Sequence, residues 1–156
     1  LPEISAGRML KAHNKYKWRS TMANTITVAD YMIKKLITLK PEMDISVAIE
    51  LFIKHKISGA PVVNDAGEII GLFSEADCIA SYLSCAYNEN SGGCGLVQDT
   101  MTTDLTTLDA NDDIIHAAQV FNEKHRRRIP VLSNGKLVGQ ISRHDLLKAI
   151  HDNGWA

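Results

Sequence analysis

The sequence lacks the segments that place a chain in a membrane or a secretory compartment. No apolar run approaches the roughly 20 residues that span a bilayer, and no segment combines a charged start, an apolar stretch and a small-residue cleavage site. Cysteine is scarce: Cys78, Cys85 and Cys94 are an odd number at spacings that fit no common zinc signature. We therefore predict a reduced, cytoplasmic protein that has no membrane partner and in which Cys78 packs in a core. Cys85 and Cys94 flank a linker and can pair under oxidation.

An excess of charge of one sign is also missing. The formal net charge is −1, so the chain has no global field that attracts nucleic acid or an anionic membrane. The stretch "HRRR" at 125–128 can touch nucleic acid by itself, but the rest of the chain offers no basic face or aromatic platform. A hydrophobic content of 45% and a charged content of 22% are typical of a globular protein. We predict a folded chain with no nucleic-acid partner.

The sequence also lacks any recognised spacing of catalytic residues. The histidines lie scattered among the cysteines and form no nucleophile–base pair or metal cluster. We therefore predict that the chain is not an enzyme and has neither a catalytic cofactor nor a metal site. Beyond the N-terminal arm, the histidines are His55, His116, His125, His144 and His151.

What the chain does contain is one unit written twice. A shift of 69 residues lays 28–52 over 97–121. Beyond Pro61 and Pro130 a one-residue deletion changes the shift to 68, and "GEIIGLFSEAD" (67–77) then lies over "GKLVGQISRHD" (135–145). The identical positions before the deletion are Val28, Asp30, Met32, Leu36, Thr38, Leu39, Asp44, Ile45, Ala48, Phe52, Pro61 and Val62.

Each unit has a readable β-α-β-β-α order. β-Branched residues suit short extended stretches, acids and cap formers precede an apolar pattern of helical spacing, and Asn134-Gly135 favours a tight hairpin. We predict an α/β (α+β) fold whose two units pack with pseudo-twofold symmetry and bury their sheets together. The predicted elements are 36–39, a helix from 45, 60–63, 68–73 and 74–83, then 105–108, a helix from 114, 129–132, 136–141 and 142–150.

The domain organisation follows from the repeat. We place the first domain at 28–84, a Gly-rich linker at 85–96, the second domain at 97–152 and a tail at 153–156. Residues 1–27 form a basic arm or a segment added for expression. The start at Leu1 indicates a fragment, a processed form or an expression product, and Met22 is an alternative start.

A serine and an aspartate recur at each point where a strand leads into a helix. In Ser74-x-x-Asp77 and Ser142-x-x-Asp145, the serine suits an N-cap and the aspartate the N3 position. The same corner also suits a ligand, because free N–H groups at a helix start bind phosphate and a carboxylate can accept hydrogen bonds from a ribose. The sequence leaves both interpretations open.

An arginine cluster, Arg126 to Arg128, precedes the first strand of the second hairpin. It is either a solvated basic edge or a phosphate site, because guanidinium binds phosphate in bidentate fashion. The first unit has Ser58 and Gly59 opposite Arg127 and Arg128. Any anion site is therefore expected to be asymmetric.

The ordered pattern P-V-V/L, G-x-x-x-G and S-x-x-D, present twice over residues 28 to about 152, resembles the cystathionine β-synthase (CBS) domain. Two such domains in tandem resemble a Bateman module. The resemblance implies a disc with two clefts that bind AMP, ADP, ATP or S-adenosylmethionine. The arginines favour the nucleotides over S-adenosylmethionine.

The resemblance also implies roles for single residues. Asp77 and Asp145 are expected to hold ribose hydroxyls, and Ser74 and Ser142 to contact phosphate. Arg127 and Arg128 match positions where basic residues meet phosphates, and with Ser142 and Asp145 they are expected to form the tighter site. His144 stands where many members have an arginine. The residues expected to line the adenine pockets are Thr38, Leu39, Thr107, Leu108, Gly59, Ala60, Pro61, Arg128, Ile129 and Pro130.

These features predict a regulatory module that senses an adenine nucleotide and acts on an unidentified protein. The resemblance implies a homodimer that associates face to face through its helices. One alternative is an interaction module whose clefts bind no ligand, and another is a regulatory fragment of a larger enzyme or transporter. A third, catalysis on a nucleotide, lacks a candidate base.

Overall fold

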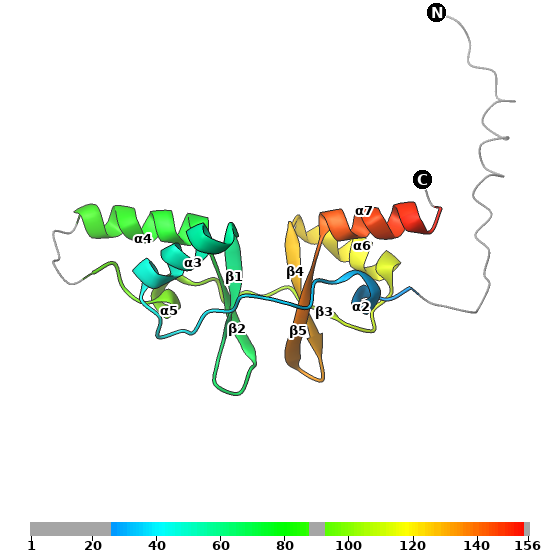
Figure 1. The fold of residues 1–156 in the computed structure, drawn as a ribbon, viewed down its shortest axis with the longest axis horizontal. Helices are drawn as coiled ribbons and strands as arrows, with labels where there is room; N and C mark the ends of the chain where they lie inside the picture. Colours follow the sequence, from blue (N-terminus) through cyan, green and yellow to red (C-terminus); the bar gives the residue numbers. More distant parts are fainter. Residues whose placement is uncertain (1–25, 88–92, 155–156) are drawn as a thin grey trace, which may run out of the picture.

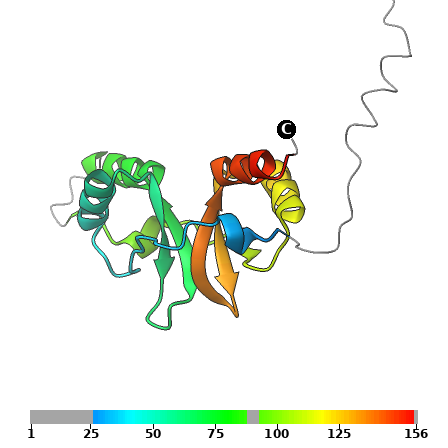
Figure 2. The same ribbon diagram turned by 45° about the vertical axis from the view of Figure 1, so that its right-hand side comes forward.

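The computed structural model describes residues 26–87 and 93–154. They form two halves side by side, each with a β-hairpin near the centre of the molecule and helices farther out (Figure 1, Figure 2). The elements are α2 (Val28–Tyr31), α3 (Ile45–His55), β1 (Gly59–Val63), β2 (Ile69–Ser74), α4 (Glu75–Tyr87), α5 (Val97–Thr100), β3 (Leu108–Asp109), α6 (Ile114–Lys124), β4 (Arg128–Ser133), β5 (Lys136–Ser142) and α7 (Arg143–Asp152). The mixed α+β fold is as predicted.

The long helices begin where the acids predict. Asp44 caps α3, its side chain accepting a hydrogen bond from the N–H of Ser46, and Asp113 caps α6 by accepting from the N–H of His116; both bonds are 2.8 Å. The caps satisfy amide groups that have no partner inside the helix. The Asn-Gly hairpin is also confirmed, since Asn134 and Gly135 have φ of 51° and 77°.

The predicted first strands are shorter than the patterns indicate. In the second half the stretch 105–108 yields only β3, which pairs in parallel with β4. In the first half 36–39 yields a single parallel bridge between Leu39 and Val62. The other strands pair as antiparallel hairpins, β1 with β2 and β4 with β5.

Each sheet packs in its own core, which corrects the expectation of one core shared by the two units. One cluster of buried residues lies in each half. Alternate strand residues such as Ala60, Val62 and Phe73 face the helices of the first half, as Ile129, Val131 and Ile141 do in the second. Each sheet therefore has only one face in an apolar core, and its other face is turned toward the opposite half.

The halves exchange their first helices. α2 lies in the second half, where Val28 is fully buried with Ile114, and α5 lies in the first half, where Val97 is fully buried with Ile45 (Figure 1). The N–H of Val28 donates to Asp112 (2.8 Å), and that of Val97 to the equivalent Met43 (2.9 Å). These helices were not predicted from the sequence, because four residues are too few to show a helical period.

The second glycine of each G-x-x-x-G lets the exchanged chain cross a strand. After α2 the backbone of Ile33 pairs with Gln140 of β5, and after α5 that of Thr102 pairs with Leu72 of β2. A Cβ on Gly139 would lie 2.8 Å from the carbonyl oxygen of Ile33, and one on Gly71 would lie 2.5 Å from the Met101 sulfur. Only glycine leaves room for these crossings, which is a physical reason for the repeated motif.

Candidate functional site

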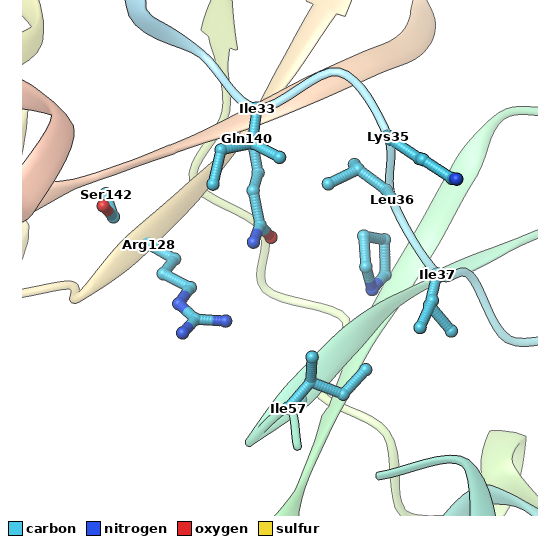
Figure 3. Close-up of a pocket in the computed structure, with 10 residues that line it drawn as sticks. Ile33, Lys35, Leu36, Ile37, Ile57, Arg128, Gln140 and Ser142 are labelled. Carbon is cyan, nitrogen blue, oxygen red and sulfur yellow. The ribbon is translucent and has the colours of Figure 1, made fainter. Parts of the chain in front are cut away.

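A cavity of about 270 Å³ lies between the halves, under the segment 33–37 that crosses from one to the other (Figure 3). We call it the first cleft. The crossing segment, strand β1 and the β4–β5 hairpin form its sides. It is lined by Ile33, Lys35, Leu36, Ile37, Ile57, Gly59, Pro61, Arg128, Gln140 and Ser142.

Strand periodicity decides which hairpin residues reach this cleft. Because successive side chains alternate between faces, residues 59 and 61 of β1 point away from the core that contains Ala60 and Val62. In the other hairpin Arg128 lies directly opposite Ser142, and Gln140, paired with Pro130, is two pairs farther along. These three side chains therefore share the strand face that is turned to the cleft.

The two sides of the cleft differ in chemistry. Leu36, Ile37 and Ile57 form an apolar wall, and Figure 3 shows the guanidinium of Arg128 and the amide of Gln140 directed into the space beside it. The ammonium of Lys35 is turned away from Arg128 in this view. An apolar wall that faces a few convergent polar groups is the usual construction of a small-molecule site.

Arg128 is exposed and available to an anion. The ion pairs between described residues are Lys40–Asp65 and His151–Asp152, and neither involves Arg128. A guanidinium without a carboxylate partner keeps its fork of donors for a phosphate or carboxylate ligand.

Both Ser-x-x-Asp corners cap their helices. At the start of α7, Asp145 Oδ2 accepts hydrogen bonds from the Ser142 N–H (2.8 Å) and hydroxyl (2.6 Å), and the Asp145 N–H donates to Ser142 Oγ (3.3 Å). At α4, Asp77 Oδ2 accepts from the Ser74 N–H (2.8 Å) and hydroxyl (2.7 Å). The capping interpretation is therefore confirmed at α7, and at α4 the structure shows the half of the capping box that Asp77 makes. The ribose and phosphate roles of these residues stay predictions.

The first cleft brings together some of the predicted site residues and not others. Gly59, Pro61, Arg128 and Ser142 line it, although they come from both units. Arg127 is exposed outside it, as is Thr38. The other nine predicted residues are buried or partly buried and do not line this cleft: Leu39, Ala60, Leu108, Ile129, Pro130, Thr107, Ser74, Asp77 and Asp145. The first four have their side chains in the cores and can offer a ligand only backbone groups.

Sequence reasoning missed the crossing segment and Gln140. Ile33, Lys35 and Ile37 reach the cleft only because α2 is exchanged, and no local pattern reveals that exchange. Gln140 carried a usable signal, since it is the polar member of a repeat position at which the first unit has Leu72.

The three cysteines form neither a disulfide bond nor a metal site in the part of the chain that the structure describes. Cys78 is buried, and burial together with the negative charge of Asp77 raises the pKa of its thiol. All three cysteines are free, and Cys85 Sγ donates to the carbonyl of Gly93 at 3.6 Å. Residues 26–87 and 93–154 contain no group of three or more His, Cys, Asp or Glu side chains placed to hold a metal. Nor does that part of the chain have a helix long and apolar enough to cross a membrane.

Similar proteins share both the sequence and the fold. The chain is 34% identical over 129 residues to an uncharacterized protein of Methanocaldococcus jannaschii, MJ1225, covering 83% of this chain and 44% of that protein. It is 30% identical over 117 residues to inosine-5'-monophosphate dehydrogenase of Thermoplasma acidophilum, covering 74% of this chain and 22% of the enzyme. The chain thus spans less than half the length of each of these two relatives.

A solved structure agrees with the fold. The crystal structure of CBSX2 from Arabidopsis thaliana in complex with AMP superposes with a TM-score of 0.72 and 27% identity, covering 83% of this chain and 98% of that one. Residues 28–84 and 97–152 each match the CBS domain. The chain therefore belongs to the CBS domain family and carries two CBS domains in tandem.

Proposed function

We propose that the chain is a non-catalytic regulatory module that binds an adenine nucleotide, AMP, ADP or ATP, in the first cleft. The observation that carries this proposal is the unpaired guanidinium of Arg128, which faces an apolar wall across a cavity of about 270 Å³. The AMP complex of CBSX2 supports the same ligand class.

The nucleotide fits this chemistry in one orientation. The base lies against Leu36, Ile37 and Ile57, whose apolar surface is removed from water on binding. The phosphate meets Arg128 on β4, and the Ser142 hydroxyl, opposite it on β5, donates to the phosphate only after turning away from Asp145 Oδ2. The negative charge of the phosphate is what favours nucleotides over the sulfonium of S-adenosylmethionine at this arginine.

Regulation follows from the position of the cleft. A ligand there contacts the crossing segment and the hairpins of both halves, so it stabilises one relative placement of the halves over others. A target protein that binds one placement more tightly is then controlled by nucleotide concentration. That target is an unidentified protein, and the chain has a regulatory role only if such a target exists.

The test is a thermal-shift titration with AMP, ADP, ATP and S-adenosylmethionine. A ligand at 100 times its Kd stabilises the fold by about 2.7 kcal/mol, which raises the melting temperature by roughly 5 to 10 °C. We expect a nucleotide to do this for the wild type and not for Arg128→Ala, while Arg126→Ala, outside the first cleft, behaves as wild type. No shift with any ligand contradicts the proposal.

We also propose that the module is a homodimer formed through its helices. Apolar side chains are exposed at equivalent positions of α4 and α7, Ile79 at 61% and Leu147 at 62%, and Tyr82 and Leu83 extend the α4 patch. These helices lie on the same side of the molecule (Figure 1). Analytical ultracentrifugation is expected to show a dimer for the wild type and a monomer for the double variant Ile79→Asp, Leu147→Asp. A monomeric wild type contradicts this proposal.

A second candidate is the same module acting inside a larger enzyme. The match to inosine-5'-monophosphate dehydrogenase, which covers 22% of that enzyme, favours it. The coding sequence on either side of the chain tests it, because a catalytic domain in the same reading frame is the expected result.

A further inference from the structure

The two halves present different side chains to the space between them. Their backbones are equivalent there: Ile33 pairs with Gln140 as Thr102 pairs with Leu72, through N–H···O bonds of 2.8 to 3.0 Å. The crossing segment 102–106 therefore occupies, over the first half's hairpin, the place that 33–37 occupies over the second half's. Differences between the two sides are differences of side chains on a common backbone.

Two hairpin positions that carry hydrogen-bond donors in the second half carry none in the side chains of the first half. The register pairs Gly59 with Ser74 and Pro61 with Leu72, where the second half pairs Arg128 with Ser142 and Pro130 with Gln140. The prolines and serines are common to both halves. Arg128 is thus replaced by Gly59, and Gln140 by Leu72, so only the second half's hairpin offers a guanidinium and an amide to the opposite half.

The apolar wall is also larger on one side than on the other. The three isoleucines that line the first cleft correspond, through the repeat shift of 69, to Thr102, Thr106 and Arg126. Lys35 corresponds to Asp104. The side under 102–106, which we call the equivalent surface, therefore keeps a leucine, Leu105, at the position of Leu36. It carries two hydroxyls and an arginine where the first cleft has isoleucines, so it offers a smaller apolar surface for a base.

We infer that each chain binds one nucleotide, in the first cleft, and that Gln140 acts with Arg128 in recognising its phosphate. This inference rests on the proposed function and goes beyond it by assigning one cleft and one further residue. It keeps Arg128 and Ser142 of the expected tighter site and leaves out Arg127 and Asp145, which do not line the first cleft. A neutral amide beside a guanidinium adds N–H donors to a phosphate oxygen without repelling it.

The repeat supplies matched variants for the test. Gln140→Leu gives the second half the residue of the first, and Leu72→Gln is the reverse exchange. Gln140→Glu keeps the shape and replaces donors with a negative charge. Because the Gln140–Ile33 bridge is made by backbone groups, the side-chain changes leave it intact, and the melting temperature without ligand confirms folding.

The experiment is isothermal titration of the full chain with AMP and with adenosine, which has no phosphate. We expect one AMP per chain, with affinity about 10-fold lower in Gln140→Leu, lower still in Gln140→Glu, and unchanged in Leu72→Gln. Adenosine affinity is expected to change little in Gln140→Glu, which a merely structural role of Gln140 does not predict.

The possible outcomes distinguish failure of this inference from failure of the proposed nucleotide binding. A wild type that binds neither AMP nor adenosine overturns the proposed function itself. Two equal AMP sites per chain, or equal losses of affinity in Leu72→Gln and Gln140→Leu, overturn the inference and leave nucleotide binding standing. Equal losses of AMP and adenosine affinity in Gln140→Glu remove the phosphate role of Gln140.

Discussion

The two halves agree where side chains face a core and differ where side chains face each other. Leu39, Ile45 and Phe52 in the first core have the counterparts Leu108, Ile114 and Phe121 in the second. On the inward-facing strand surfaces, Gly59 and Leu72 stand against Arg128 and Gln140. The shared residues are the ones that each half needs to fold, and the residues that differ are the ones that a ligand between the halves would meet.

In our proposal, this contrast is how a duplicated chain acquires one binding site in place of two. The crossing glycines, the Ser-x-x-Asp caps and the cores maintain the symmetry of the backbone. A few substitutions at positions that no core requires then make the sides chemically unequal. The following variants compare equivalent positions, beginning with the largest expected effect.

The crossings are the most sensitive shared feature. Gly139→Ala is expected to destabilise the fold by about 3 kcal/mol, because the new Cβ meets the Ile33 carbonyl oxygen at 2.8 Å and a backbone cannot easily withdraw. Gly71→Ala meets mainly the flexible Met101 side chain, so about 1 kcal/mol is expected. Urea denaturation measures both values. Equal losses of unfolding free energy in the two variants contradict the view that the Ile33 backbone leaves less room at Gly139 than Met101 leaves at Gly71.

The two caps differ in burial. Asp145 is 4% exposed and Asp77 is only partly buried. Removing Asp145 leaves the Ser142 N–H without its acceptor at a buried helix start, so Asp145→Ala is expected to cost about 2 kcal/mol and Asp77→Ala about 1 kcal/mol. The same denaturation assay compares them. A larger loss for Asp77→Ala is the opposite of the expected order.

Cys78 occupies the position that Leu146 occupies in the second half, and both are buried. Burial and the nearby Asp77 raise the pKa of the Cys78 thiol, so less of the reactive thiolate is present near pH 8. We expect Cys78 to be the last of the three cysteines to react with iodoacetamide, followed by mass spectrometry. Rapid labelling of Cys78 in the folded protein contradicts its place in the core.

The smallest effect belongs to a surface pair that only the first half has. Lys40 Nζ lies 2.9 Å from Asp65 Oδ1, and Asp109 stands at the equivalent of Lys40. The hydrogen bond and charge of Lys40 lower the pKa of Asp65. A carboxyl with a lowered folded-state pKa stabilises above its ordinary value and loses that contribution as the pH falls below about 4. Asp65→Asn is expected to leave the melting temperature at pH 7 almost unchanged, since exposed pairs contribute little.

Much of the fold could be predicted from the sequence because its signals are local. The acids before 45 and 114 predicted the helix starts, and Asn134-Gly135 predicted the hairpin. The exchange of α2 and α5 could not be predicted in this way. It depends on contacts such as that of Val28 with Asp112, more than 80 residues away, and on nothing in the local pattern.

The candidate site was predicted only in part, because some of its residues have a local sequence signal and others reach it through the exchange of α2. Arg128 and Ser142 stood out as an arginine and a cap residue beside a strand, and both line the first cleft. Their opposite wall comes from the crossing segment, so Leu36 and Ile37 were not predicted as its partners. Leu39 and Ile129, which the family resemblance suggested, have their side chains in the cores.

The most direct test of the account is an NMR titration of the full chain with AMP, which follows the side-chain Nε–H of Arg128 and the side-chain amide of Gln140. The account predicts that both signals shift in saturable fashion, together with the backbone amides of 35–37 and Ile57, while those of Thr102, Thr106 and Arg126 stay in place. Shifts centred on the equivalent surface, or no saturable shift at either place, would contradict it.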